Sequence, residues 1–257
     1  MRVVVLGSGT SMGVPVLGCT CDVCTSSDPK DKRTRVAAVI DGDDGGRILV
    51  DTPPELRLQL LAAGVASVDA VLFTHDHADH VHGIDDLRVM SQRNGELPLY
   101  GPGDTLDRIT RRFDYIFDPA VVAPKGTYKP KLRPSPLTAG ESLQIAGIDV
   151  LPIALSHGVM TVYGYRFGSF AYLTDVKTVT DDAIAALAGV RVLVINALFD
   201  RPHPTHLSIP EAIDVAQAIG AEQTYLTHLT HRYSHQDLST RLPEGIEPAY
   251  DGLTLDV

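Results

Sequence analysis

The sequence contains no long apolar run and no segment typical of a secretion signal. Its apolar stretches are short, such as Val3–Leu6 and Val192–Ile195, and fall well below the roughly eighteen residues of a membrane-spanning helix. Only five apolar residues precede Gly7, which is too few for the apolar core of a signal peptide. We therefore expect a protein that has no membrane partner and resides in the cytoplasm.

Basic residues are scarce relative to acidic ones. The chain has 22 Lys and Arg residues against 32 Asp and Glu residues, which gives a formal net charge of −10 at pH 7. Proteins that bind nucleic acids generally present a basic surface, so this balance disfavours a nucleic-acid partner. An anionic substrate must then be held by a local positive group, and a metal ion is one candidate.

Nothing in the composition indicates disorder or a second domain. Hydrophobic residues make up 44% of the chain and charged residues 21%, as in an ordinary folded protein. A length of 257 residues is near the upper limit for one core, and no repeat or linker divides the sequence. We predict a single domain over residues 1–257.

Cysteine is confined to one short stretch, at Cys19, Cys21 and Cys24. An odd number of closely spaced cysteines is a poor disulfide framework in a cytoplasmic protein. The spacing favours a metal ion bound by thiolates.

Short β-rich runs alternate with helical patterns, which indicates an α/β fold. Strands are predicted at Val3–Leu6, Val36–Ile40, Ile48–Val50, Ala70–Phe73, Ile148–Ile153, Ala171–Leu173, Val192–Ile195 and Thr224–Leu226. Helices are predicted at Glu55–Ala63, Ile84–Ser91, Asp181–Ala188 and Glu211–Ile219. Ser208 and Glu211 form a capping box for the last helix. Between Gly101 and Gly140, prolines and basic residues predict a surface loop or insertion.

The densest signal is the run from His75 to His80, which directly follows a predicted strand. His75, His77, Asp79 and His80 place four candidate ligands within six residues. Imidazole and carboxylate groups suit zinc, iron and manganese. A loop that leaves a strand can aim the first two ligands at one point and the last two at another, so we expect two metal ions. Asp76 lies between ligands and is predicted to act as a general base or to support a ligand.

This run resembles the signature of the metallo-β-lactamase superfamily, and the other motifs of that family can be matched in order. The matches are Asp51 in Leu49-Val50-Asp51-Thr52-Pro53, His157 in Ser156-His157-Gly158, Asp175 in Leu173-Thr174-Asp175 and His228 in Leu226-Thr227-His228. The resemblance implies a four-layer αββα sandwich. It implies one metal held by His75, His77 and His157, and a second held by Asp79, His80 and His228. Asp175 is implied to bridge the two metals, and Asp51 to orient a histidine rather than to bind metal.

Two N-terminal features resemble the PhnP family, whose members are phosphodiesterases acting on phosphoribosyl 1,2-cyclic phosphate. They are the segment Gly7–Pro15 and the Cys19-x-Cys21-x-x-Cys24 spacing. The family carries a structural zinc bound by three such cysteines and a distant histidine. That histidine is implied to be His231, with His235 as the weaker alternative. Three thiolates and one imidazole complete a closed tetrahedral site.

The resemblance implies a phosphodiesterase that hydrolyses a small cyclic phosphodiester. Two divalent ions, manganese or zinc, would provide the hydroxide that attacks phosphorus. His206 matches an extra histidine that phosphodiesterase members place near the phosphate. We expect His206 to donate a proton to the leaving oxygen, with stabilisation of transition-state charge as the alternative.

Other functions stay open. A tRNA 3′-end endonuclease shares the metal ligands, and the basic run Lys125–Arg133 suits RNA, but the net charge opposes it. A non-catalytic protein resembling pyrroloquinoline quinone biosynthesis protein B shares the cysteine pattern, although that group has degenerate metal motifs. A zinc β-lactamase is disfavoured because no cysteine follows Cys24. The physiological substrate, the catalytic metal and the oligomeric state, including a homodimer, are not determined by the sequence.

Overall fold

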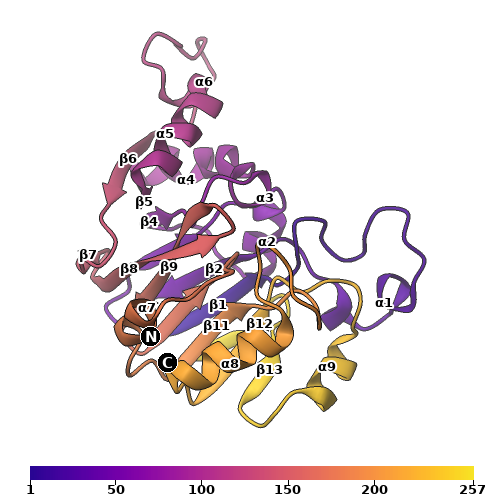
Figure 1. Cartoon of the computed structure of the whole chain (residues 1–257). Coiled ribbons are helices and arrows are strands. Elements are labelled where there is room, and N and C mark those ends of the chain that lie inside the picture. The colour runs from indigo at the N-terminus through magenta and orange to yellow at the C-terminus, as the bar shows by residue number, and fades with distance from the viewer.

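Two mixed β-sheets pack face to face in the computed structural model, which describes every residue from Met1 to Val257 (Figure 1). The first sheet is built from β1 (Arg2–Gly7), β2 (Ala37–Asp41), β3 (Arg47–Val50), β4 (Ala70–Leu72), β5 (Leu97–Pro102), β6 (Leu132–Leu137) and β14 (Thr254–Asp256). The second is built from β7 (Leu143–Ile145), β8 (Ile148–His157), β9 (Met160–Phe167), β10 (Phe170–Leu173), β11 (Val192–Asn196), β12 (Gln223–Thr227) and β13 (Ile246–Pro248). The strand orders are β14-β1-β2-β3-β4-β5-β6 and β13-β12-β11-β10-β9-β8-β7.

Helices flank both sheets and complete the four layers of the expected αββα sandwich. They are α1 (Asp22–Thr25), α2 (Leu56–Ala62), α3 (Ala78–Val81), α4 (Arg88–Asn94), α5 (Gly103–Arg112), α6 (Asp114–Phe117), α7 (Asp181–Ala186), α8 (Ile209–Ile219) and α9 (His235–Arg241). Short 3₁₀ helices lie at Pro29–Asp31 and Ile84–Leu87. None of the helices has the length and apolarity needed to span a bilayer.

Three buried apolar layers hold the sandwich together. Val3 and Val5 of β1 face the layer between the sheets, whereas Val4 and Leu6 of the same strand face the helices. Because both faces of β1 are buried, its sequence is continuously apolar rather than alternating. The third layer packs the second sheet against α7 and α8.

Parallel pairing brings the carboxyl ends of several strands to one edge of each sheet. In the first sheet, β3 pairs in parallel with β4, and β4 with β5. In the second sheet, β10, β11, β12 and β13 pair in parallel one after another. The loops that follow these strands carry most of the predicted residues of the dinuclear site, whereas His157 ends the antiparallel strand β8. Such strand ends are the usual ligand-binding edge of an α/β sheet.

All eight predicted strands are present, and β8 runs on to His157. The Ser208–Glu211 capping box is confirmed, and α8 begins at the next residue after Ser208. The strands that the sequence did not reveal are β5, β6, β7, β9, β13 and β14. Most of these are only three to six residues long or contain proline, so their apolar pattern is weak.

Of the predicted surface loop or insertion between Gly101 and Gly140, the loop alternative was wrong for much of the segment. It contains α5, α6 and β6, and β6 pairs in parallel with β5. The helical pattern of α5 was hidden because its polar residues predominate and only Thr105, Leu106 and Ile109 are buried. β6 accommodates two prolines because it is an edge strand.

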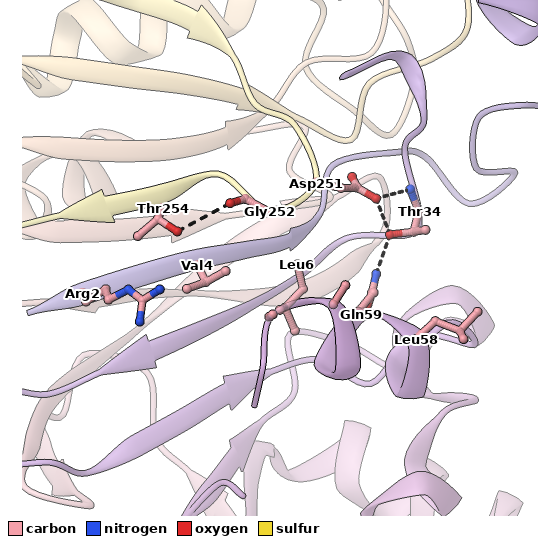
Figure 2. A pocket seen from close by; sticks show the side chains of 11 residues that line it. Arg2, Val4, Leu6, Thr34, Leu58, Gln59, Asp251, Gly252 and Thr254 are labelled. Carbon is pink, nitrogen blue, oxygen red and sulfur yellow. Dashed lines mark hydrogen bonds between the residues drawn. The ribbon is translucent and has the colours of Figure 1, made fainter. Parts of the chain in front are cut away.

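A part-buried carboxylate, Asp251, joins separate segments beside a groove of about 420 Å³ (Figure 2). Its Oδ1 accepts hydrogen bonds from N and Oγ of Ser8 at 2.9 and 2.8 Å. Its Oδ2 accepts from N and Oγ1 of Thr34 at 2.7 and 2.6 Å. Gln59 of α2 donates to Thr34 Oγ1, and the Ser8 carbonyl accepts the Leu229 N–H. Asp251 thus connects the glycine-rich N-terminal segment to the loop that follows β12.

We expect Asp251→Ala to lower the free energy of unfolding by about 3 kcal/mol, because hydrogen-bond donors of Ser8 and Thr34 lose a charged acceptor. Urea denaturation measures this change. Asp256→Ala is the matched control, since Asp256 is exposed and its side chain makes no hydrogen bond or ion pair. Equal denaturation midpoints for the two variants would contradict a structural role for Asp251.

Candidate metal centre

The predicted site residues lie at strand ends of both sheets. Asp51 directly follows β3, and His75 lies three residues after the end of β4. From the second sheet, His157 ends β8, Asp175 comes two residues after β10, and His228 directly follows β12. Segments far apart in the sequence therefore meet at one place.

Three of these residues have a left-handed backbone conformation. The φ angles of Asp51, Asp175 and His228 are 62°, 56° and 57°, and Ala146 is the one other non-glycine residue in this region. The conformation costs roughly 1 kcal/mol or more for a residue with a side chain. The sharp turns direct these side chains into the site. The backbone strain is therefore located at residues of the candidate metal centre.

The first ligand group consists of His75, His77 and His157, whose ligand atoms lie within 4.8 Å of one another. His157 Nδ1 donates to the carbonyl of Thr205 at 2.7 Å. His75 Nδ1 lies 3.0 Å from Thr74 Oγ1, which donates its own proton to Asp51. These contacts occupy Nδ1 of both rings and leave Nε2 available for a metal. His77 is exposed, whereas His75 and His157 are buried.

The second group consists of Asp79, His80 and His228, also within 4.8 Å of one another. Asp51 Oδ2 accepts a hydrogen bond from His80 Nδ1 at 2.7 Å, and Asp51 Oδ1 accepts from the Thr74 N–H at 2.9 Å. Asp51 therefore orients the His80 ring and lies behind it, outside the ligand groups.

Asp175 lies between the two groups. Its carboxylate oxygens lie 3.1 Å from His80 Nε2 and 3.4 Å from His228 Nε2, and Oδ1 accepts a hydrogen bond from His206 Nε2 at 2.9 Å. It shares one cluster of possible ligands with His75 and His80, and a second with His157 and His206. Burial on its own raises the pKa of this carboxyl. The rings of His228 and His80, which attract the carboxylate when they are protonated in acid, and the bond from His206 hold the pKa well below its usual range.

His206 lies inside the site, and Asp76 is turned away from it. The His206 ring stacks on His228 with centroids 4.7 Å apart, and its Nδ1 lies 2.9 Å from Thr205 Oγ1. Asp76 instead accepts hydrogen bonds from Arg108 and Arg112 of α5, at 3.0 Å each. The structure brings Asp76 into none of the ligand groups.

The donor set fits divalent metal ions. The buried ring nitrogens of His75, His80 and His228 include Nε2 atoms with no hydrogen-bond partner. Burial lowers the pKa of His75 far below its ordinary value and that of His228 to about 4, so both rings are neutral near pH 7, as metal ligation requires. Burial also lowers the pKa of His80, but the carboxylates around it, Asp175 first, raise the pKa well above its usual value. This arrangement favours positive charge at the centre of the site.

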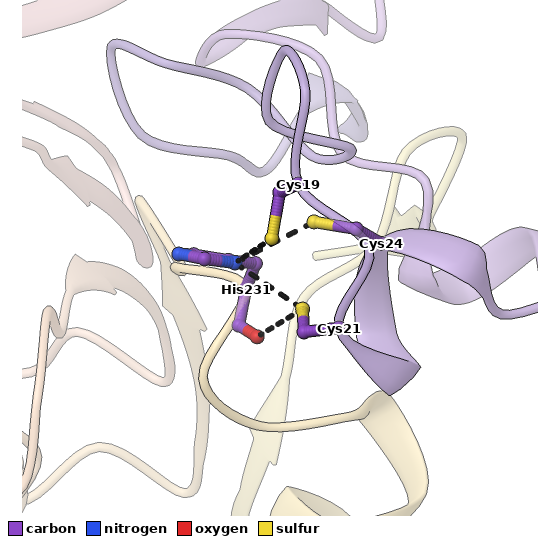
Figure 3. Close-up of side chains that lie close together, drawn as sticks. All are labelled: Cys19, Cys21, Cys24 and His231. Atoms are coloured by element: carbon purple, nitrogen blue, oxygen red, sulfur yellow. Dashed lines mark hydrogen bonds between the residues drawn. The ribbon is translucent and has the colours of Figure 1, made fainter.

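A second cluster, apart from these groups, joins the three cysteines to His231 (Figure 3). The sulfur atoms of Cys19, Cys21 and Cys24 lie 3.4, 3.4 and 3.5 Å from His231 Nδ1. Zinc bond lengths in a tetrahedron place sulfur and nitrogen about 3.5 Å apart, so the cluster has the dimensions of a zinc site. His235 lies outside it: its backbone N–H donates to Asp31, and its ring packs on Tyr250.

Arg33 was missed in the sequence, although it supports both clusters. It is fully buried, and its guanidinium donates to the carbonyl oxygens of Thr230 and Tyr233. These carbonyls belong to the loop that carries His228 and His231. A single arginine within a polar segment carries no sequence signal for such a contact, since its partners lie about 200 positions away.

Comparison with known proteins shows which family this chain belongs to. Residues 46–229 match the family model described as "Beta-lactamase superfamily domain". The chain is 42% identical over 257 residues to a protein named Octanoyltransferase from Porphyromonas gingivalis (strain ATCC BAA-308 / W83). The match covers 98% of this chain and 51% of that protein, so the chain spans about half the length of this relative.

Solved structures match this chain over nearly the full length of both chains. A new diphosphatase from the PhnP family is 38% identical with a TM-score of 0.91, and the match covers 100% of this chain and 97% of that chain. Zn²⁺-bound PqqB from Methylobacterium extorquens shares the fold, with 21% identity, a TM-score of 0.81 and full coverage of both chains. The family model and the 38% identical structure together show that the chain belongs to the metallo-β-lactamase superfamily and, within it, to the PhnP family.

Proposed function

We propose that this protein is a metal-dependent phosphodiesterase that hydrolyses a small cyclic phosphodiester, 5-phosphoribosyl 1,2-cyclic phosphate or a similar ester. The observation that carries the proposal is the combination of two ligand groups, a shared carboxylate and one further imidazole, His206, at a single site. The membership in the PhnP family supports the choice of a phosphate ester as substrate.

The residues divide into two sets of metal ligands and one proton donor. His75, His77 and His157 would hold the first ion, Asp79, His80 and His228 the second, and Asp175 both. Two divalent ions, manganese or zinc, would supply a nucleophile from water near neutral pH and neutralise charge on the phosphoryl oxygens. Asp51 keeps His80 in the ring orientation that presents Nε2 to the site.

His206 is the residue we assign to proton transfer. Its Nε2 lies beside Asp175 at the centre of the site, and its Nδ1 is held by Thr205 Oγ1. The bond to Thr205 at Nδ1 holds the ring so that Nε2 faces the centre of the site. With the Asp175 carboxylate bound to the metal ions, Nε2–H would be released from Asp175 and donated to the oxygen that departs when the cyclic ester opens.

A second candidate is hydrolysis of a diphosphate, because the 38% identical relative is named a diphosphatase. The same ligands and the same proton donor serve either reaction, since both displace an oxygen from phosphorus. A substrate panel on one metal-reconstituted preparation separates them: a ribose 1,2-cyclic phosphate, a 2′,3′-cyclic nucleotide, a dinucleoside diphosphate and a precursor tRNA. We expect fastest turnover of a cyclic ester. Exclusive cleavage of the diphosphate or the tRNA would overturn the first proposal, and no turnover of any of them would favour a binding protein.

Asp175→Asn should remove one metal ion per chain and lower turnover by more than about a hundred-fold. A loss of about a hundred-fold is the most that is usually seen when a residue only supports a metal ligand, so a larger loss indicates a ligand. The amide lacks the negative charge and the second carboxylate oxygen that a shared ligand needs. Elemental analysis and diester hydrolysis measure both effects, with exposed Asp182→Asn as the control. A variant with full metal content and near-normal turnover would show that Asp175 is not a shared ligand.

His206→Ala should reduce turnover of a substrate with an alkoxide leaving group by roughly a hundred- to ten-thousand-fold. The loss should be much smaller with a nitrophenolate, which leaves without a proton. Metal content should match that of the wild type, and His82→Ala should behave as the wild type because His82 lies outside the ligand groups. Equal losses on both leaving groups would refute proton donation, and loss of a metal would make His206 a ligand.

We propose that the cysteine cluster holds one structural zinc ion. Cys21→Ser or His231→Ala should then remove one zinc per chain and lower the melting temperature, because part of the metal's binding energy stabilises the fold. His235→Ala tests the alternative ligand and should retain the zinc. An unchanged melting temperature with unchanged zinc content in Cys21→Ser and His231→Ala would rule out this site.

A further inference from the structure

Each of two loops carries a residue of the metal centre and also an exposed arginine. The loop between β11 and α8 contains Arg201 and His206, and the loop after β12 contains His228 and Arg232. Neither arginine has a place in the ligand groups or in the proton transfer described above.

Both arginines converge on one aromatic side chain, Phe199. The guanidinium carbon of Arg232 lies 5.1 Å from the centroid of the Phe199 ring, and that of Arg201 lies 5.8 Å from it. The carbonyl of Phe199 accepts a hydrogen bond from the N–H of Ile209, the first residue of α8, at 2.7 Å. The backbone of Phe199 is therefore anchored to the start of α8, and its ring contacts both cations through cation–π interactions.

A continuous row of side chains leads from this arginine pair to the metal centre. The ring centroids of Phe199 and His203 lie 5.9 Å apart. His203 Nδ1 lies 3.3 Å from His206 Nδ1, and His206 Nε2 contacts Asp175. The pair therefore lies on the same side of the site as the proton donor, two imidazole rings away from the shared carboxylate.

The two arginines have no anionic partner in the protein. Two other basic side chains in this region form ion pairs: Arg241 with Asp200 at 3.0 Å and Lys177 with Glu211 at 2.6 Å. Arg201 and Arg232 form no ion pair, although acidic residues outnumber basic ones by 32 to 22 in this chain. Their N–H groups are free to bind an anion, and the guanidinium fork matches a phosphate group in geometry.

We propose that Arg201 and Arg232, supported by Phe199, bind a second phosphate group of the substrate, remote from the phosphorus that is attacked. This inference rests on the proposed phosphodiesterase function and assigns two residues to the remote phosphate of the proposed ester, a group that simple diesters lack. It also gives the zinc cluster a role, because His231 directly precedes Arg232 and fixes the backbone from which that side chain extends.

The test compares two cyclic esters that differ only in the remote phosphate, ribose 1,2-cyclic phosphate with and without a 5-phosphate, and adds bis(p-nitrophenyl) phosphate as a simple diester. For Arg201→Gln with Arg232→Gln in the metal-loaded protein, we expect KM for the 5-phosphorylated ester to rise by about ten- to a hundred-fold. The kinetic constants for the other two substrates should not change. Zinc content should also stay constant.

Arg191→Gln is the matched control, because exposed Arg191 precedes the opposite end of β11 and its side chain makes no ion pair. It should leave all constants unchanged. Equal effects of the double variant on the ester with and without the 5-phosphate, or no effect on either, would overturn the subsite.

A binding measurement separates failure of the subsite from failure of the proposed function. If the wild type cleaves none of these esters, the phosphodiesterase proposal fails, and calorimetry with ribose 5-phosphate still tests the arginines. We expect binding to the wild type that is at least about ten-fold weaker in the double variant, and no comparable binding of unphosphorylated ribose. Equal affinity of wild type and double variant for ribose 5-phosphate would contradict the assignment.

Discussion

The contacts of the Asp175 carboxylate join the two halves of the molecule at the site. Asp175 follows a strand of the second sheet, yet one of its oxygens lies 3.1 Å from His80, which belongs to the loop after β4 of the first sheet. Two carboxylates and several imidazoles can share this buried space only if their charges are balanced. The sandwich therefore positions donors from both sheets around a centre that favours a cation, and the strained backbone at Asp51, Asp175 and His228 serves the same arrangement.

The cysteine cluster and the candidate metal centre are connected through one loop. His228 and His231 lie three positions apart, and Leu229 between them pairs with the N-terminal segment that Asp251 holds in place. Arg33 caps two carbonyls of the same loop from its buried side. A change at the cysteine cluster would therefore shift His228 as well, although the cysteines lie outside the ligand groups of the candidate metal centre.

The residues that cluster at the candidate metal centre were predictable from the sequence because most of them occur in a dense motif or directly after an apolar strand. The supporting contacts were not, because Arg33 and Asp251 reach segments about 200 positions away and no local pattern marks them. The environment of Asp76 depended on α5, whose polar sequence hid the helix that supplies Arg108 and Arg112. The arginine pair at Phe199 likewise forms only when two loops meet in the fold.

We propose that two metal ions act together at the candidate metal centre, while one zinc ion in the cysteine cluster only supports the fold. Removing the metals from the wild type and titrating manganese or zinc back, with elemental content and cyclic-ester turnover measured together, tests this division of roles. We expect one zinc that resists removal and activity that rises until two further ions are bound per chain. Full activity with a single added ion, or with none, would contradict it.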